Sequence, residues 1–174
     1  MNKTDERENN SPKKSISIAI IGASGSVGKE LISILADRGY LIKNIQLFAS
    51  SRSAGETISF GERSIQIKEL SDHNQIEADI AFFATSESIA TNFIPHLAKR
   101  GVFCIDKSSA FRMAKNVPLI VSGVNDSDLK NLGSTKIIAC PNCVATPLAQ
   151  ILSPIDKKYG ITQVVVSTYQ AVSG

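Results

Sequence analysis

Gly22-Ala23-Ser24-Gly25-Ser26-Val27-Gly28 is the stretch that decides the fold. A β-branched run at residues 16–21 precedes it, and a segment with the periodicity of an amphipathic helix follows it. The apolar residues of that segment, spaced as on one helix face, are Val27, Leu31, Ile34 and Leu35. A strand, a glycine-rich turn and a helix together form the arrangement that holds a dinucleotide pyrophosphate on backbone N–H groups. The alternative is a tight structural turn without a ligand.

The rest of the chain alternates strand and helix patterns. We expect a hairpin around Gly61, a mostly irregular segment at 106–135, and a strand at 79–84 whose apolar run suits burial on both faces. Further strands are expected at 45–49, 57–60, 64–67, 102–105, 136–139 and 162–168, and helices at 86–99 and from 141 to 159. This order predicts an α/β fold, Rossmann-like and doubly wound, with a mainly parallel sheet.

Three parts of the chain are expected to differ. Residues 1–14 are polar and mixed in charge, which predicts a disordered leader. Residues 15–140 form the dinucleotide-binding domain, and residues 141–174 begin a second α/β domain. The last apolar strand has no helix after it to cover the sheet, so we expect this second domain to be truncated.

Composition and charge exclude several classes of protein. A net charge of +3 from 19 basic and 16 acidic residues, without a basic block, argues against nucleic acid as a partner. No apolar run reaches the roughly 18 residues of a membrane span, and no signal peptide is evident, so we expect a cytoplasmic protein. A single CxxC pair, far from both histidines, predicts no metal site.

The loop after the second strand indicates which dinucleotide is preferred. NAD enzymes usually have an acidic residue there, and this chain has Ser50, Ser51, Arg52 and Ser53 instead. Arginine and serine suit a 2′-phosphate, so the loop predicts NADP. Alternatively, Arg52 is a solvated loop cation. The predicted cofactor residues are Gly22, Ser24, Gly25, Ser26, Val27, Gly28, Ser50, Ser51, Arg52, Ser53 and Ser86.

Cys143 lies where a strand passes into a helix. A helix N-terminus favours the thiolate form, which makes Cys143 a candidate nucleophile. Two alternatives stay open: a small buried cysteine, or a thioredoxin-like pair with Cys140. For Cys104 and Cys140 a structural role is favoured. Pro147 requires either that Thr146 caps a helix starting at the proline or that the first turn is distorted.

Several motifs together resemble the aspartate-semialdehyde dehydrogenase family, from about residue 15 to the end of the chain. Besides the glycine turn and the Ser50–Ser53 loop, these motifs are Ser108-Ser109-Ala110-Phe111-Arg112-Met113, Pro141-Asn142-Cys143 and Ser167-Thr168-Tyr169-Gln170-Ala171-Val172-Ser173-Gly174. The resemblance implies NADP-dependent interconversion of aspartyl phosphate, formed with phosphate, and aspartate semialdehyde, on the route to lysine, methionine and threonine.

The resemblance also implies the roles of single residues. Cys143 would form the thioester, Gln170 would place the substrate, and Arg112 and Asn142 would bind the phosphate or acyl-phosphate end. A planar guanidinium suits a phosphate dianion, and a neutral amide can orient a carbonyl. The alternative for Arg112 is a loop cation paired with an acid such as Asp106.

The chain departs from the family pattern at Lys107, Cys140 and Gly123, which puts local loop geometry in doubt. Family members continue for about as many residues again, forming homodimers or homotetramers and supplying a substrate arginine and an acid/base histidine. Neither His73 nor His96 matches that histidine, so we expect the isolated chain to turn over little or nothing. Other readings are an N-acetyl-glutamyl-phosphate reductase-like enzyme and a non-catalytic dinucleotide-binding relative.

Overall fold

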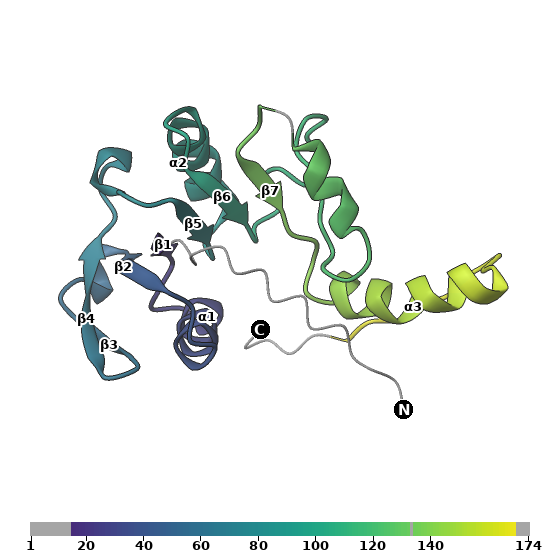
Figure 1. Cartoon of the computed structure of the whole chain (residues 1–174), viewed down its shortest axis with the longest axis horizontal. Coiled ribbons are helices and arrows are strands. Elements are labelled where there is room, and N and C mark those ends of the chain that lie inside the picture. Colours follow the sequence, from purple (N-terminus) through teal and green to yellow (C-terminus); the bar gives the residue numbers. More distant parts are fainter. Residues whose placement is uncertain (1–14, 133, 170–174) are drawn as a thin grey trace.

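The computed structural model describes residues 15–132 and 134–169 of the 174-residue chain. Its described part contains one seven-stranded sheet with the strand order β3-β4-β2-β1-β5-β6-β7 (Figure 1). Every neighbouring pair is parallel except β3 and β4, which form the expected hairpin. The strands are β1 (Ile16–Ile21), β2 (Ile42–Ala49), β3 (Thr57–Phe60), β4 (Arg63–Glu69), β5 (Ile80–Phe83), β6 (Phe103–Asp106) and β7 (Ile137–Ala139).

Helices cover both faces of the sheet, which confirms the doubly wound α/β fold. Figure 1 shows α1 (Ser26–Asp37) and α2 (Glu87–Lys99) on opposite sides of the strands. Successive residues of β1 pack into two different clusters, with Ile18 and Ile20 on the α1 side and Ala19 and Ile21 on the α2 side. The remaining helices are α3 (Ala145–Tyr159) and the 3₁₀ turns η1 (Ser51–Ser53), η2 (His73–Gln75) and η3 (Asp126–Asn131).

The strand order reverses direction between β1 and β5. From β1 the chain first moves outward to β2 and β4, then returns to the other side of β1 and continues through β5, β6 and β7. Loops that leave the carboxyl ends of β1 and β5 therefore diverge. In open parallel sheets this divergence produces the crevice in which ligands bind.

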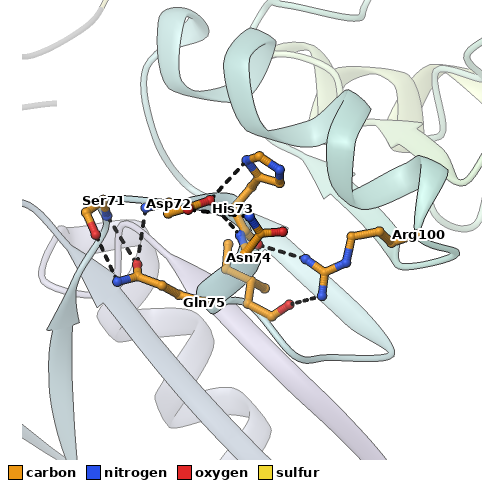
Figure 2. A network of polar contacts seen from close by, with 7 residues as sticks. Ser71, Asp72, His73, Asn74, Gln75 and Arg100 are labelled. Carbon is orange, nitrogen blue, oxygen red and sulfur yellow. Dashed lines mark hydrogen bonds and ion pairs between the residues drawn. The ribbon is translucent and has the colours of Figure 1, made fainter.

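The connection between β4 and β5 is fixed by a polar network, drawn in Figure 2. The Asp72 carboxylate caps η2 by accepting the Asn74 N–H at 2.9 Å, and this bond lowers the pKa of Asp72. Arg100, at the end of α2, donates to the carbonyls of His73 and Ile76 at 2.9 and 3.1 Å. The His73 ring stacks on His96 with centroids 4.3 Å apart. Both histidines are thus engaged in holding this connection against α2.

The four apolar residues predicted to share one face of the first helix are divided between core and surface. Leu35 is buried and Leu31 packs against the cluster on the α1 side of the sheet, whereas Val27 and Ile34 are exposed. The other buried residues of α1 are Gly28 and Ile32. Periodicity finds an apolar stripe but does not decide how much of it meets the sheet.

Two strand predictions also need correction. Residues 162–168 form no strand, and Val165 is 84% exposed, because no described segment offers this stretch a backbone partner. In β5 only Ala81 and Phe83 are fully buried, whereas Ile80 and Phe82 are half-buried, so the strand is not sealed on both faces. The predicted disordered leader, residues 1–14, lies outside the described residues. No helix in the described part is long and apolar enough to cross a membrane.

Candidate active site

The glycine turn passes close against the end of β5. Gly22 has a φ of 88°, and a Cβ on it would lie 2.2 Å from the carbonyl oxygen of Ala84. Its N–H donates to Phe48 on β2 at 2.9 Å, and its carbonyl accepts the Gly25 N–H at 3.1 Å. The turn therefore lies at the junction of β1, β2 and β5, where a side chain at position 22 has no room.

Gly28 lets α1 begin directly against this turn. A Cβ on Gly28 would lie 2.2 Å from the Gly22 oxygen and 2.9 Å from the Ala23 Cα. The first helical bond runs from the Lys29 N–H to the Gly25 carbonyl at 2.9 Å. The N–H groups of Ser26, Val27 and Gly28 precede this bond and lie at the positive end of the helix, which favours an anion there.

A cavity of about 500 Å³ opens above the turn, and we call it the glycine-turn cavity. It brings together six of the predicted cofactor residues: Gly22, Ser24, Gly25, Ser50, Ser51 and Ser86. The other predicted residues do not line it. Arg52 is exposed on η1 outside the lining, Ser53 is buried, and Val27 faces a different cavity.

Other residues of this cavity were missed by sequence reasoning. They are Ile21, Ala49, Glu69, Leu70, Ala84, Thr85, Ile89 and Phe93. Ala84 and Thr85 directly follow β5, so the rule that ligands bind at carboxyl ends of strands could have identified them. Glu69 and Leu70 could not be found in this way, because nothing in the sequence says that β4 pairs beside β2.

The cysteine segment connects β7 to α3 through a turn built by Asn142. The Asn142 Oδ1 accepts the Val144 N–H at 2.8 Å, and its carbonyl accepts the Thr146 N–H at 3.1 Å. Helix α3 then begins at Ala145. Pro147 is the third residue of the helix, so the expectation that the helix starts at Pro147 is wrong. The N–H groups of its neighbours Thr146 and Leu148 donate to the carbonyls four residues earlier, at 3.1 and 3.4 Å, and the proline lacks the corresponding N–H.

Cys143 is exposed and lines a cavity of about 330 Å³, which we call the cysteine cavity. Its Sγ lies 3.8 Å from the Asn142 Oδ1. The cavity is also lined by Arg112, Asn142, Ala84 and Thr85. The last two residues line the glycine-turn cavity as well, so the two cavities adjoin at the end of β5. The thiol is therefore neither sealed in the interior nor turned away from the glycine turn.

Arg112 stabilises the cysteine segment and is not paired with Asp106. Its Nε donates to the Cys140 carbonyl at 2.9 Å and its Nη2 to the Lys107 carbonyl at 3.0 Å. The buried Asp106 carboxylate instead accepts the Ser108 N–H and hydroxyl, both at 2.9 Å. The alternative of an Arg112–Asp106 pair was wrong. The bonds of Arg112 leave further guanidinium N–H groups at the cysteine cavity.

The other two cysteines are held as neutral thiols. Burial raises the pKa of Cys104 to about 12, with a further contribution from Asp106. Burial also raises the pKa of the half-buried Cys140, an effect that Lys107 partly offsets. Both thiols are thus protonated at neutral pH, which agrees with the structural role expected for them. Among the described residues, no group of three or more His, Cys, Asp or Glu side chains could hold a metal ion.

Alkylation should distinguish Cys143 from Cys104. At pH 7.5 the native chain is expected to react with iodoacetamide at Cys143 and not at Cys104, because a thiol of pKa about 12 has only about 10⁻⁵–10⁻⁴ of its population as thiolate. Peptide mass spectrometry at pH 7.5 and 9.0 checks this, and Cys104 should stay unmodified at both. Labelling in 8 M urea serves as the control in which all three thiols react. Equal labelling of Cys104 and Cys143 in the native chain would contradict the assignment.

Comparison with known families decides the relationship. The family model described as "Semialdehyde dehydrogenase, NAD binding domain" matches residues 17–132. The chain belongs to this family. The motif resemblance to aspartate-semialdehyde dehydrogenases is confirmed by relatives bearing that name, one of which, from Rickettsia bellii, is 46% identical over 161 residues. That alignment covers 92% of this chain and 48% of the relative, so the chain spans about half the length of the relatives it matches.

Solved semialdehyde dehydrogenase structures share the fold. Aspartate semialdehyde dehydrogenase II from Vibrio cholerae, complexed with ASA, is 31% identical with a TM-score of 0.79, covering 85% of this chain and 48% of that chain. The enzyme from Candida albicans with NADP is 26% identical with a TM-score of 0.69, covering 85% and 48%. These matches confirm the Rossmann-like fold. The predicted substrate residue Gln170 lies outside the described residues.

Proposed function

We propose that this chain is the cofactor-binding and nucleophile-bearing part of an enzyme that interconverts aspartyl phosphate and aspartate semialdehyde with NADP. The observation that carries the proposal is that Cys143 lines a cavity sharing Ala84 and Thr85 with the glycine-turn cavity. A dinucleotide bound in the glycine-turn cavity would approach Cys143 at the end of β5. The activity belongs to biosynthesis of lysine, methionine and threonine, in the cytosol.

The chemistry assigned to the chain begins at Cys143. Its thiolate attacks the aldehyde carbon, and the resulting thiohemiacetal becomes a thioester when its hydride is lost. Bound NADP supplies the acceptor for that hydride. Inorganic phosphate then attacks the thioester carbonyl, which releases aspartyl phosphate and regenerates the thiolate. In the biosynthetic direction the same steps run in reverse.

Neighbouring residues position the reacting groups. Two carbonyl partners fix the Arg112 side chain at the cysteine cavity, which suits binding of a phosphate dianion. The Oδ1 of Asn142 is occupied by the Val144 N–H, so its amide nitrogen is the group that can orient a substrate carbonyl. By the family resemblance, Gln170 places the substrate, and residues 141–174 begin a second domain that completes the site and forms a homodimer or homotetramer.

Arg52 is the residue expected to favour NADP over NAD. Replacing Arg52 by alanine should weaken NADP binding by about tenfold or more and leave NAD nearly unchanged, since only NADP has the 2′-phosphate. Isothermal titration with both dinucleotides measures this. Arg63→Ala is the matched control, because Arg63 lies over the Phe60 ring in the β3–β4 hairpin. Equal losses for NADP and NAD in Arg52→Ala would count against a phosphate contact.

Turnover is tested by adding the C-terminal half of a relative. The chain alone, and the chain mixed with the C-terminal half of a relative, are given aspartate semialdehyde, phosphate and NADP, and reduced cofactor is followed at 340 nm. We expect turnover in the mixture and little or none with the chain alone. A mixture that assembles and binds NADP without any turnover would overturn the enzymatic proposal and favour a non-catalytic dinucleotide-binding protein.

A further inference from the structure

The carboxyl end of β4 lies beside the carboxyl end of β2. Ala49 pairs with Glu69 in the parallel register, and the Leu70 N–H continues the ladder to the Ala49 carbonyl at 2.8 Å. The loop that begins at Ser50 has no acidic residue of its own. The neighbouring strand β4 supplies one, Glu69, beside the start of this loop. Both Ser50 and Glu69 line the glycine-turn cavity.

Glu69 is an acidic residue in the lining of a cavity whose glycine turn suits a phosphate anion. Among the described residues that line the cavity, it has the only charged side chain. It is exposed, and its carboxylate makes no ion pair or hydrogen bond to another residue in the described part of the chain. An exposed carboxylate on a residue that lines a ligand cavity, without a partner among the described residues, can accept a hydrogen bond from a ligand.

The lining of the cavity combines two kinds of groups. The glycine turn supplies backbone N–H groups that suit phosphate. Leu70, Ile89 and Phe93 supply apolar surface, and all three pack against the cluster on the α2 side of the sheet. A flat aromatic base can pack on this apolar surface, and Glu69, which precedes Leu70 in the chain, lines the same cavity.

We infer that Glu69 recognises the 6-amino group of the adenine base. The inference rests on the proposed NADP site and adds base recognition to it. The exocyclic amine is the hydrogen-bond donor on adenine, and a carboxylate is a strong acceptor for it. A 6-oxo base such as hypoxanthine has an acceptor at that position and is repelled. The 2′-phosphate, also an anion, then lies away from Glu69, toward Ser51 and Arg52.

A binding experiment with paired ligands tests this recognition. Kd values are measured by isothermal titration for NADP and for its hypoxanthine analogue, with the wild-type chain, Glu69→Gln and Glu62→Gln. The wild type is expected to prefer NADP by about tenfold. Glu69→Gln should lose or reverse that preference, because its amide can donate to a 6-oxo group. Glu62, exposed in the β3–β4 turn and not a lining residue of the cavity, provides a control that keeps the wild-type ratio.

Other outcomes overturn the inference in distinguishable ways. If Glu69→Gln keeps the wild-type ratio between the two bases, the carboxylate does not contact the base. If it changes the NADP to NAD ratio and leaves the base ratio unaltered, the carboxylate faces the ribose and the assignment is wrong. If the wild type binds neither NADP nor its analogue, the proposed dinucleotide site itself fails.

Discussion

Replacing Cys143 by serine is expected to lower turnover in the reconstituted mixture by at least about 10⁴-fold, the scale seen when an enzymatic nucleophile is removed. The thiolate of Cys143 attacks the carbonyl, and a serine hydroxyl in its place is a much weaker nucleophile. No histidine of the described chain lines the cysteine cavity to activate such a hydroxyl. NADP binding should be unchanged, because Cys143 lines the cysteine cavity and not the glycine-turn cavity. Initial rates at 340 nm and titration with NADP measure the two quantities separately.

Cys140→Ser is the matched control for this variant. It makes the same chemical change three residues earlier, at a thiol whose pKa is raised by burial. Its turnover should stay within a few-fold of the wild-type rate. If Cys143→Ser and Cys140→Ser had similar rates, Cys143 would be excluded as the nucleophile.

Replacing Gly28 by alanine is expected to destabilise the chain by roughly 2–4 kcal/mol and to abolish measurable NADP binding. Helix propensity alone predicts the opposite sign, a gain of about 1 kcal/mol for glycine to alanine inside a helix. The steric term dominates, because the new Cβ would lie 2.2 Å from the Gly22 oxygen, an atom of the backbone. Helix α1 would have to move away from the turn whose N–H groups form the anion site. Urea unfolding and NADP titration check both effects.

Gly61→Ala provides the control for backbone effects. Gly61 has a φ of 58° and open space around it, so the substitution should cost about 1–2 kcal/mol through the left-handed backbone alone. NADP affinity should not change, since Gly61, in the turn of the hairpin, does not line the glycine-turn cavity. A Gly28→Ala chain that is as stable as the wild type, with normal affinity, would contradict the close-packing account of the glycine turn.

Local signals in the sequence were sufficient for the fold and for the position of Cys143. The strand, turn and helix at residues 16–37 appear as predicted because the glycines encode backbone conformations that other residues cannot adopt there. Cys143 occupies the predicted strand-to-helix junction, and the Asn142 side chain builds the turn that exposes it. These features depend on residues that are close together in the sequence. Sequence patterns are informative over such short separations.

Features that depend on long-range pairing were not predictable. Glu69 lines the cavity because β4 pairs with β2. The spatial order of the strands in a sheet does not follow from their order in the sequence. Only part of the apolar stripe predicted on α1 packs on the sheet, because Val27 and Ile34 instead line a cavity together with Cys140 and Cys143. Residues 162–168 have strand-forming composition, but a strand also requires a backbone partner, which composition does not reveal.

The most direct test of the two-cavity site is a crystal structure of this chain with NADP bound. We expect the diphosphate on the N–H groups of the Gly22–Gly28 turn and the nicotinamide at Ala84 and Thr85, with its C4 within about 4 Å of the space next to the Cys143 Sγ. A dinucleotide seated on the glycine turn with its nicotinamide directed away from the cysteine cavity would contradict the account, because Cys143 and the hydride acceptor would then not share a substrate.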